Sequence, residues 1–229
     1  MLSESSLQKL QQLLQRIVEA DTDDFIELAK LVGFDPLKDF AGAKLVGAEL
    51  RAAQLVGADL IGSKLVRANL INANLSQANL TEANLTEADL TNAILDNAIL
   101  TNVNLTGAKL SSARLLHAKL AEATLTQAQL NHANCRRANL VGAQLSNIQA
   151  RGTMFSHSDL RRANLTSADL TGASLYGTNL SDANLSFTNL SHTNLDGATL
   201  RRTQFAGNEG LTKSSIWELK QRGAIFERS

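Results

Sequence analysis

The chain has 229 residues, of which 44% are hydrophobic but only 4% aromatic, so its core must consist of small and medium aliphatic side chains. Its 22 basic and 22 acidic residues balance, which argues against a whole molecule that binds polyanions or mimics DNA. The single cysteine, Cys135, excludes an internal disulfide framework. The N-terminus does not show the basic start and apolar run of a signal peptide, and the sequence contains no run of 18 apolar residues. We therefore expect a cytoplasmic chain without a membrane span.

The first segment, residues 1–37, contains two stretches in which apolar residues recur at helical spacing. A serine pair that can cap a helix precedes the first stretch, and the second ends at Gly33 before Pro36. The pattern predicts an αα-hairpin. Its apolar faces are Leu7, Leu10, Leu14 and Ile17 in the first helix and Phe25, Leu28, Ala29 and Val32 in the second.

From Phe40 to Phe205 the sequence repeats every five residues, through 34 pentads without an insertion or deletion. The central position is usually Leu, as at Leu45, and a small residue, usually Ala, stands two positions earlier, as at Ala43. A short and strict period indicates a solenoid in which each unit buries its apolar side against its neighbours.

Inward residues two positions apart match an extended segment, and the three-residue gap to the next pair requires a turn. Such a pattern predicts an all-β solenoid of short sides joined by corners. The central positions depart from Leu at Cys135 and Phe155, which are twenty residues apart and would stack in a coil of four pentads. A second exchange, between Ile148 and Ala150, lies beside them. Compensated packing is the favoured interpretation, and a local bend or shallow pocket is the alternative.

The repeated motif resembles the A(D/N)LXX signature of the pentapeptide-repeat family, and the resemblance covers residues 38–207. It implies a right-handed quadrilateral β-helix of about 8.5 four-pentad coils, which at about 4.8 Å per coil would be a rod of about 40 Å. Clear copies are Ala68-Asn69-Leu70, Ala78-Asn79-Leu80, Ala88-Asp89-Leu90, Ala163-Asn164-Leu165 and Ala168-Asp169-Leu170.

The polar columns have structural explanations. We expect the Asn/Asp side chains before each central residue to hold the turns by hydrogen bonds to nearby backbone. Threonines that replace Ala toward the end of the array, such as Thr178 and Thr203, need backbone partners if buried. We expect cross-coil hydroxyl contacts within one further column, which consists of Thr86, Thr106, Thr126, Ser146, Thr166 and Ser186.

Candidate catalytic or metal-binding groups are few. His117 and His157 share a face at four pentads per coil but lie two coils apart, about 10 Å, which is too far for one metal ion. Cys135 occupies a core position and is expected to behave as a small hydrophobe. We therefore expect no enzyme activity, no metal and no cofactor.

The distribution of charge is uneven in the repeats. Residues 109–162 carry eight basic residues against two acidic ones. One interpretation is a docking surface for an acidic protein partner, since arginine pairs well with carboxylates, and the other is an ordinary solvated face. The candidate patch consists of Arg136, Arg137, Arg151, Arg161, Arg162, Arg201 and Arg202.

The repeat ends at Gly207. The tail that follows, residues 208–229, predicts a short capping helix that starts at Thr212 or Ser214. We expect Trp217 and Phe226 to plug the end of the rod, with a dimer contact as the alternative. The chain would then be a monomer or a dimer through an end cap. Both ends resemble modules found on many members of the family.

These observations favour a non-catalytic scaffold that presents a rigid surface, or its helical module, to a protein partner of unknown identity. The alternative is the topoisomerase (gyrase)-binding DNA mimic known in this family, which the neutral-to-basic repeat region disfavours. Nucleic acid is not an expected partner, because no aromatic residues lie among the arginines. A membrane partner is not expected either.

Overall fold

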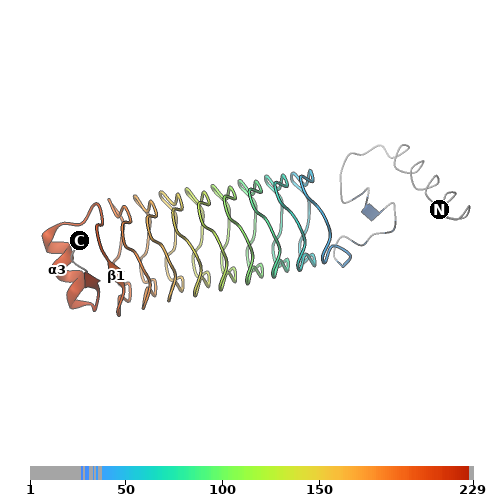
Figure 1. Cartoon of the computed structure of the whole chain (residues 1–229). Helices are drawn as coiled ribbons and strands as arrows, with labels where there is room; N and C mark the ends of the chain where they lie inside the picture. Colours follow the sequence, from blue (N-terminus) through green and yellow to red (C-terminus); the bar gives the residue numbers. More distant parts are fainter. Residues whose placement is uncertain (1–26, 28, 31–32, 34, 36–37, 227–229) are drawn as a thin grey trace, which may run out of the picture.

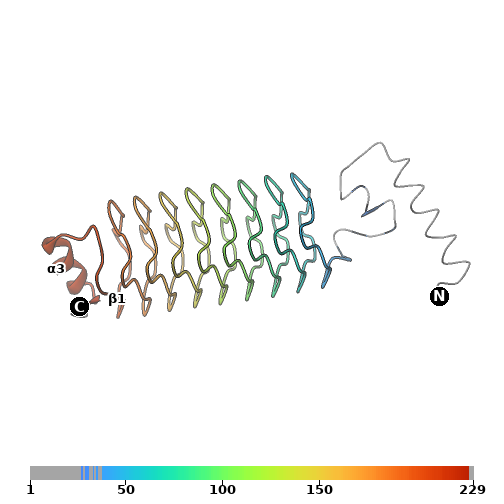
Figure 2. The same ribbon diagram turned by 45° about the horizontal axis from the view of Figure 1, so that its top comes forward.

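The computed structural model describes residues 27, 29–30, 33 and 35 and the continuous segment 38–226. Across that segment the chain winds into a rod of stacked coils, seen from two directions in Figures 1 and 2. The αα-hairpin expected in residues 1–37 lies outside the described residues, apart from those few positions. Within the described segments, none of the helices has the length and apolar character needed to cross a bilayer.

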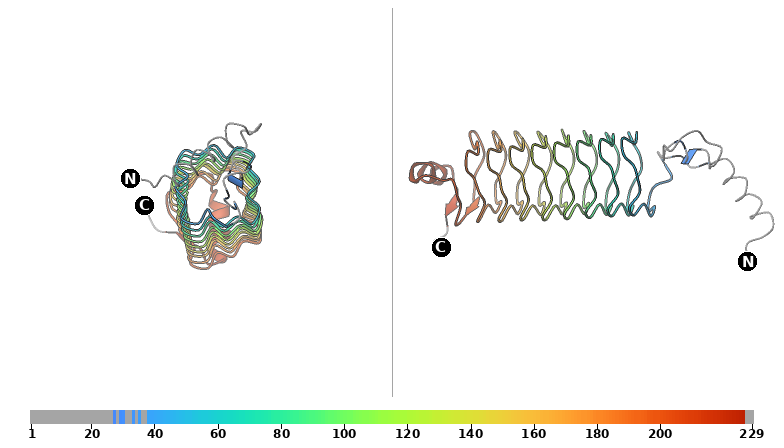
Figure 3. Two further views of the ribbon diagram at one scale, coloured as in Figure 1. Left: turned by 90° about the vertical axis from the view of Figure 1, so that its right-hand side faces the viewer. Right: turned by 90° about the horizontal axis from the view of Figure 1, so that it is seen from above.

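A ladder of parallel bridges joins successive coils, and each bridge pairs residues that are twenty positions apart. The bridges recur at every fifth residue, from Lys44 with Lys64 to Asn189 with Glu209. Viewed along the axis, the coil has a four-sided outline (Figure 3, left). A repeat of twenty residues is four pentads, so the predicted number of pentads per coil is confirmed.

The inward columns form one continuous apolar core along the rod. Leu100 and Ala98, in the middle of the array, are both fully buried. This uniform filling follows from the alternation of a small and a medium side chain within each pentad, which brings both onto the inner face of a short extended side.

The irregular core positions also face inward. Cys135, Ile148, Ala150 and Phe155 are all buried. The ladder continues through this region without interruption, with bridges both from residue 129 to 149 and from 134 to 154. An uninterrupted ladder is what compensated packing requires.

Each corner is a tight turn that places its second residue in the left-handed region. At one corner, the Ala58 amide donates to the Leu55 carbonyl at 3.1 Å. Twenty-three non-glycine residues among those described have a φ between 55° and 62°. Asn, Asp and His tolerate this conformation better than other residues with a Cβ, and His117 and His157 both adopt it.

The Asn/Asp column stabilises these corners, as predicted. Asn79 Oδ1 accepts hydrogen bonds from the Thr81 amide at 3.1 Å and from the Thr81 hydroxyl at 2.6 Å. Similar bonds occupy Thr86, Thr106 and Thr166. The expectation of cross-coil hydroxyl contacts in that column was therefore wrong for these three threonines, because each hydroxyl bonds to the asparagine two residues earlier. It is confirmed for Thr126 and Ser146, whose hydroxyl oxygens lie 3.4 Å apart on successive coils.

Buried threonines near the end of the array do find backbone partners. Thr178 Oγ1 donates to the Phe155 carbonyl at 2.9 Å, and Thr203 Oγ1 donates to the Leu180 carbonyl at 2.8 Å. Replacement of Ala by Thr on the inner face therefore leaves no hydroxyl unsatisfied at these two positions, which is the condition for burying a polar group without a large cost.

The C-terminal segment folds back against the last coil. Strand β1 (Gln204–Phe205) pairs in parallel with β2 (Ile225–Phe226), and α3 (Lys213–Gln221) lies between them in sequence and at the end of the rod (Figure 1). Thr212 is the N-cap of α3, which confirms one of the two predicted helix starts. Leu219, on the inner face of the helix, is buried.

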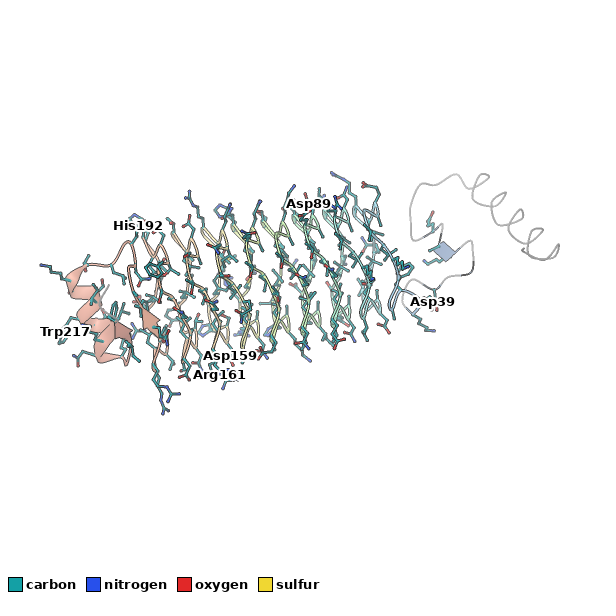
Figure 4. All side chains as sticks on the ribbon, in the orientation of Figure 1. Asp39, Asp89, Asp159, Arg161, His192 and Trp217 are labelled. Atoms are coloured by element: carbon teal, nitrogen blue, oxygen red, sulfur yellow. The ribbon has the colours of Figure 1, made fainter. Side chains whose placement is uncertain are left out.

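The two predicted plug residues differ. The ring of Phe226 stacks on Phe205, with centroids 4.9 Å apart. Trp217 is 67% exposed and points away from the coils (Figure 4), so its prediction as a plug was wrong. Successive helical residues are about 100° apart, so a helix that turns Leu219 inward directs the side chain two positions earlier toward solvent.

Arg222 also stabilises the C-terminal end of the rod, although the sequence did not indicate this role. Its Nη2 atom donates to the carbonyls of Leu195 and Ala198 at 2.7 and 2.6 Å. Both carbonyls belong to the last coil. The Leu195 carbonyl also accepts the Ala198 amide at 3.2 Å, whereas the Ala198 carbonyl lacks the amide that a next coil would supply, so the guanidinium satisfies an acceptor that would otherwise depend on water.

Candidate functional site

The seven candidate arginines lie on three of the four corners. Residues that differ by a multiple of twenty stack, which places Arg161 and Arg162 on the same corner as Arg201 and Arg202, as predicted. Arg151 lies on another corner. The corner between these two carries the adjacent pair at residues 136–137. The structure therefore spreads the seven side chains around much of the coil instead of gathering them on one face.

Four of these arginines are neutralised by nearby carboxylates. The pairs are Arg151–Asp169 at 2.5 Å, Arg161–Asp159 at 2.7 Å, Arg162–Glu122 at 3.5 Å and Arg202–Asp182 at 2.5 Å. Figure 4 shows one such pair at the edge of the rod. The hydrogen bond from Arg202 lowers the pKa of the Asp182 carboxyl below its ordinary value. These pairs account for much of the basic excess in the sequence.

Arg136 and Arg137 make no ion pair within the described part of the chain. They line a groove of about 390 Å³ on their corner, which runs along the rod axis. One row of side chains in the groove consists of Leu116, Arg136, Ser156 and Tyr176, and the parallel row consists of His117, Arg137 and His157. In both rows, neighbouring members are twenty residues apart, so successive coils supply them.

Two local features determine the shape of the groove beside His157. The imidazole packs edge-on against the Tyr176 ring, with centroids 5.3 Å apart and an interplanar angle of 89°. It also lies over Gly177, where a Cβ atom would come within 2.7 Å of the His157 Nδ1 atom. Glycine at this corner therefore leaves the space that the imidazole occupies.

His117 and His157 were predicted to share a face, and the groove confirms that placement. Arg137, which stands between them at the same spacing, was not among the predicted members of that face. A count of polar residues at intervals of twenty would have found the row. In the described residues, no group of three or more His, Cys, Asp or Glu side chains is arranged to hold a metal ion.

Cys135 is buried, and burial raises the pKa of its thiol to about 12. At pH 8 only about one thiol in ten thousand would then be ionised. We expect no reaction with a thiol reagent in native buffer at pH 8 and complete labelling in guanidinium chloride, because the thiolate is the reactive form. Labelling followed over hours would measure this, and stoichiometric labelling of the folded protein would contradict it.

The sequence matches the family described as "Pentapeptide repeats (8 copies)". The matched segments are 39–70, 68–107, 98–134, 108–147, 118–156, 143–182 and 178–207. A comparison with curated proteins finds no match.

Two solved structures resemble the rod. HetL is a pentapeptide repeat protein involved in heterocyst differentiation regulation, from the cyanobacterium Nostoc sp. strain PCC 7120. It is 31% identical, with a TM-score of 0.52, and the match covers 87% of this chain and 90% of HetL. QnrB1, a plasmid-mediated fluoroquinolone resistance protein, is 16% identical with a TM-score of 0.59, over 83% of this chain and 90% of QnrB1. The likeness to QnrB1 concerns the fold alone.

Proposed function

Since this chain belongs to the pentapeptide-repeat family, whose fold is the right-handed quadrilateral β-helix, we propose that it is a non-catalytic scaffold that binds another protein in the cytoplasm. Two adjacent arginines without an ion pair among the described residues, beside a groove, carry this proposal, whereas four other arginines of the candidate patch are ion-paired. A rod with a continuous ladder and core holds its outward side chains in fixed register. Such rigidity reduces the entropy lost when a partner binds.

The partner surface that the structure favours is the corner of Arg136 and Arg137. Both guanidinium groups are free to form two parallel hydrogen bonds to a carboxylate. The ion-paired arginines elsewhere in the candidate patch would first have to give up a carboxylate of this chain. An acidic partner therefore gains more at the unpaired corner, and the remaining five arginines would contribute at its margins.

The DNA-mimic alternative requires a continuous negative stripe. Between residues 38 and 207, the only two acidic residues at the spacing of twenty that stacks neighbouring coils are Asp39 and Asp59, at the first turn of the array, and no third acidic residue continues that pair. Several carboxylates also hold arginines or lysines of this chain, as Asp89 holds Lys109 at 3.4 Å. Both observations support a scaffold over a mimic. The likeness to HetL, named for a role in regulation, supports a regulatory setting for the scaffold.

The proposed organisation has three parts. Residues 1–37 form a helical module that caps the rod or recruits a partner, residues 38–207 form about 8.5 coils, and residues 208–229 close the other end. A solenoid with closed ends stays a monomer or associates through a cap. The burial of Leu219 and Ala224 against the last coil supports the closure at the C-terminal end.

A pull-down from the native host's lysate tests this proposal. We expect a specific partner to bind the intact chain and to bind Arg136→Gln/Arg137→Gln at least about tenfold more weakly, because two charge-assisted hydrogen-bond sites are lost. The matched control is Arg161→Gln/Arg162→Gln, which removes the same charge from arginines already paired with Asp159 and Glu122.

Three results would contradict the proposal. Equal loss in the control would mean that net charge alone attracts the partner. A partner lost only when residues 1–38 are deleted would move the contact from the corner to the N-terminal module. If no protein bound any variant above background, the scaffold itself would be refuted.

A further inference from the structure

The groove lined by Arg136 and Arg137 lacks internal compensation for its charge. No acidic residue lines it. Asp96 and Asp196 continue the row of Leu116 and Tyr176 one coil beyond each end, outside the lining residues, and two carboxylates around the groove are already engaged. Asp96 holds Arg114 at 2.5 Å and accepts the Leu116 amide at 3.1 Å, and Asp159 is held by Arg161. Two positive charges therefore face the groove without a negative one.

The donors outnumber what one carboxylate can accept. Arg136, Arg137, His117, His157 and Tyr176, each of which carries a side-chain donor, line the same space, and the Ser156 hydroxyl beside them already bonds to the Ser174 hydroxyl at 2.9 Å. Three successive coils supply the imidazoles and the guanidinium between them, so the His117–Arg137–His157 row spans about 10 Å. Arg137 lies one coil, about 5 Å, from each imidazole, so one anion with several oxygens bound at Arg137 would have donors on both sides.

The walls of the groove are suited to an organic group beside the anion. Leu116 stands at one end and the Tyr176 ring, 48% exposed, at the other. The edge contact with Tyr176 fixes the His157 ring, which occupies the space over Gly177. The groove volume of about 390 Å³ lies within the usual range for small-ligand sites.

We propose that this groove is a binding site for a phosphate monoester. A phosphate monoester carries a charge between −1.5 and −2 near pH 7 and three terminal oxygens, which matches two arginines and the surrounding donors. This inference goes beyond the proposed scaffold function, because the site would bind a small phosphate ester or a phosphorylated side chain of a partner by the same contacts.

Titration of the full chain with phenyl phosphate, followed by amide chemical shifts, tests the site. We expect saturable binding with shifts confined to residues 116–177, and binding of benzoate at least about tenfold weaker, because a carboxylate uses fewer of the donors. Arg136→Gln/Arg137→Gln should weaken phenyl phosphate binding at least about tenfold. The control is Arg201→Gln, which removes an arginine without an ion pair among the described residues but outside the groove, and it should change nothing.

A second variant tests the geometry without removing a charge. Gly177→Ala would force the His157 imidazole out of its position, since the new Cβ would lie 2.7 Å from Nδ1. The rod should still fold, because non-glycine residues occupy the same corner conformation at 23 other described positions. We expect phenyl phosphate binding to fall severalfold with an unchanged circular dichroism spectrum.

A phosphoserine peptide that competes with phenyl phosphate would assign the site to a partner's modified side chain, and failure to compete would assign it to a free ester. Equal binding of benzoate, equal weakening by Arg201→Gln, or no saturable binding would overturn the proposal. The pull-down of an unmodified partner could still succeed in that case, so the two proposals fail separately.

Discussion

Leu100→Asp is expected to destabilise the rod by more than about 4 kcal/mol and to unfold the coils around it. Leu100 is fully buried, with Leu80 and Leu120 stacked above and below it in equally dry positions. Burial of a leucine contributes about 1.5–3 kcal/mol, and an unpaired carboxyl in its place adds a desolvation cost. Neighbouring coils lose their interface with the damaged one, so the effect spreads along the array.

The matched control for this substitution is Asn104→Asp. It places the same carboxyl in the same coil, but on an outer side next to a corner, where Oδ1 already accepts the Thr106 amide and hydroxyl at 3.0 and 2.7 Å. We expect its effect to stay within about 1 kcal/mol, as for substitutions away from the core. Thermal unfolding by circular dichroism measures both. Equal midpoints for Leu100→Asp and the unsubstituted protein would refute the inward placement of the Leu column.

Removal of residues 208–229 is expected to convert the rod into a species that self-associates. The deletion uncovers Phe205, which is fully buried, and removes the Arg222 guanidinium from the carbonyls of Leu195 and Ala198. A terminal coil with free backbone groups and an open apolar centre is a template for the coil of another rod. Sedimentation velocity should show a dimer or larger species at micromolar concentration.

Trp217→Ala separates this effect from specific dimerisation. Trp217 is exposed on α3, and its loss uncovers no core residue. If the intact chain is a monomer, this variant should sediment identically. If the intact chain is a dimer that Trp217→Ala dissociates, the tryptophan is the dimer contact, and the truncation result would need a different explanation.

The sequence predicted the main chain path because one period governs it. Steric alternation along short extended sides fixes which residues face inward, and the spacing between Cys135 and Phe155 indicated four pentads per coil. That period is confirmed by the bridges twenty residues apart. The helix after Thr212 was predicted from its capping residue and apolar spacing, and α3 begins at the next residue.

The groove and the charge pairing were not predictable from the period alone. Arg151 reaches Asp169, which is eighteen residues away, so its partner lies on the neighbouring side of the next coil and not directly above it. Which carboxylate an arginine reaches depends on the direction in which the corner projects the side chain. Trp217 failed for a related reason, since apolar character alone does not say which side of a short helix faces the coils.

The twenty-residue ladder also restricts how such a rod can change in length. Loss of five residues between two coils would turn every later corner by a quarter of a revolution relative to the earlier ones. Arg137 would then leave the row that it shares with His117, although each pentad would still be intact. Only the loss or gain of a whole coil of twenty residues preserves the alignment. A groove built from successive coils therefore depends on the positions of its residues around the rod axis more than on the length of the array.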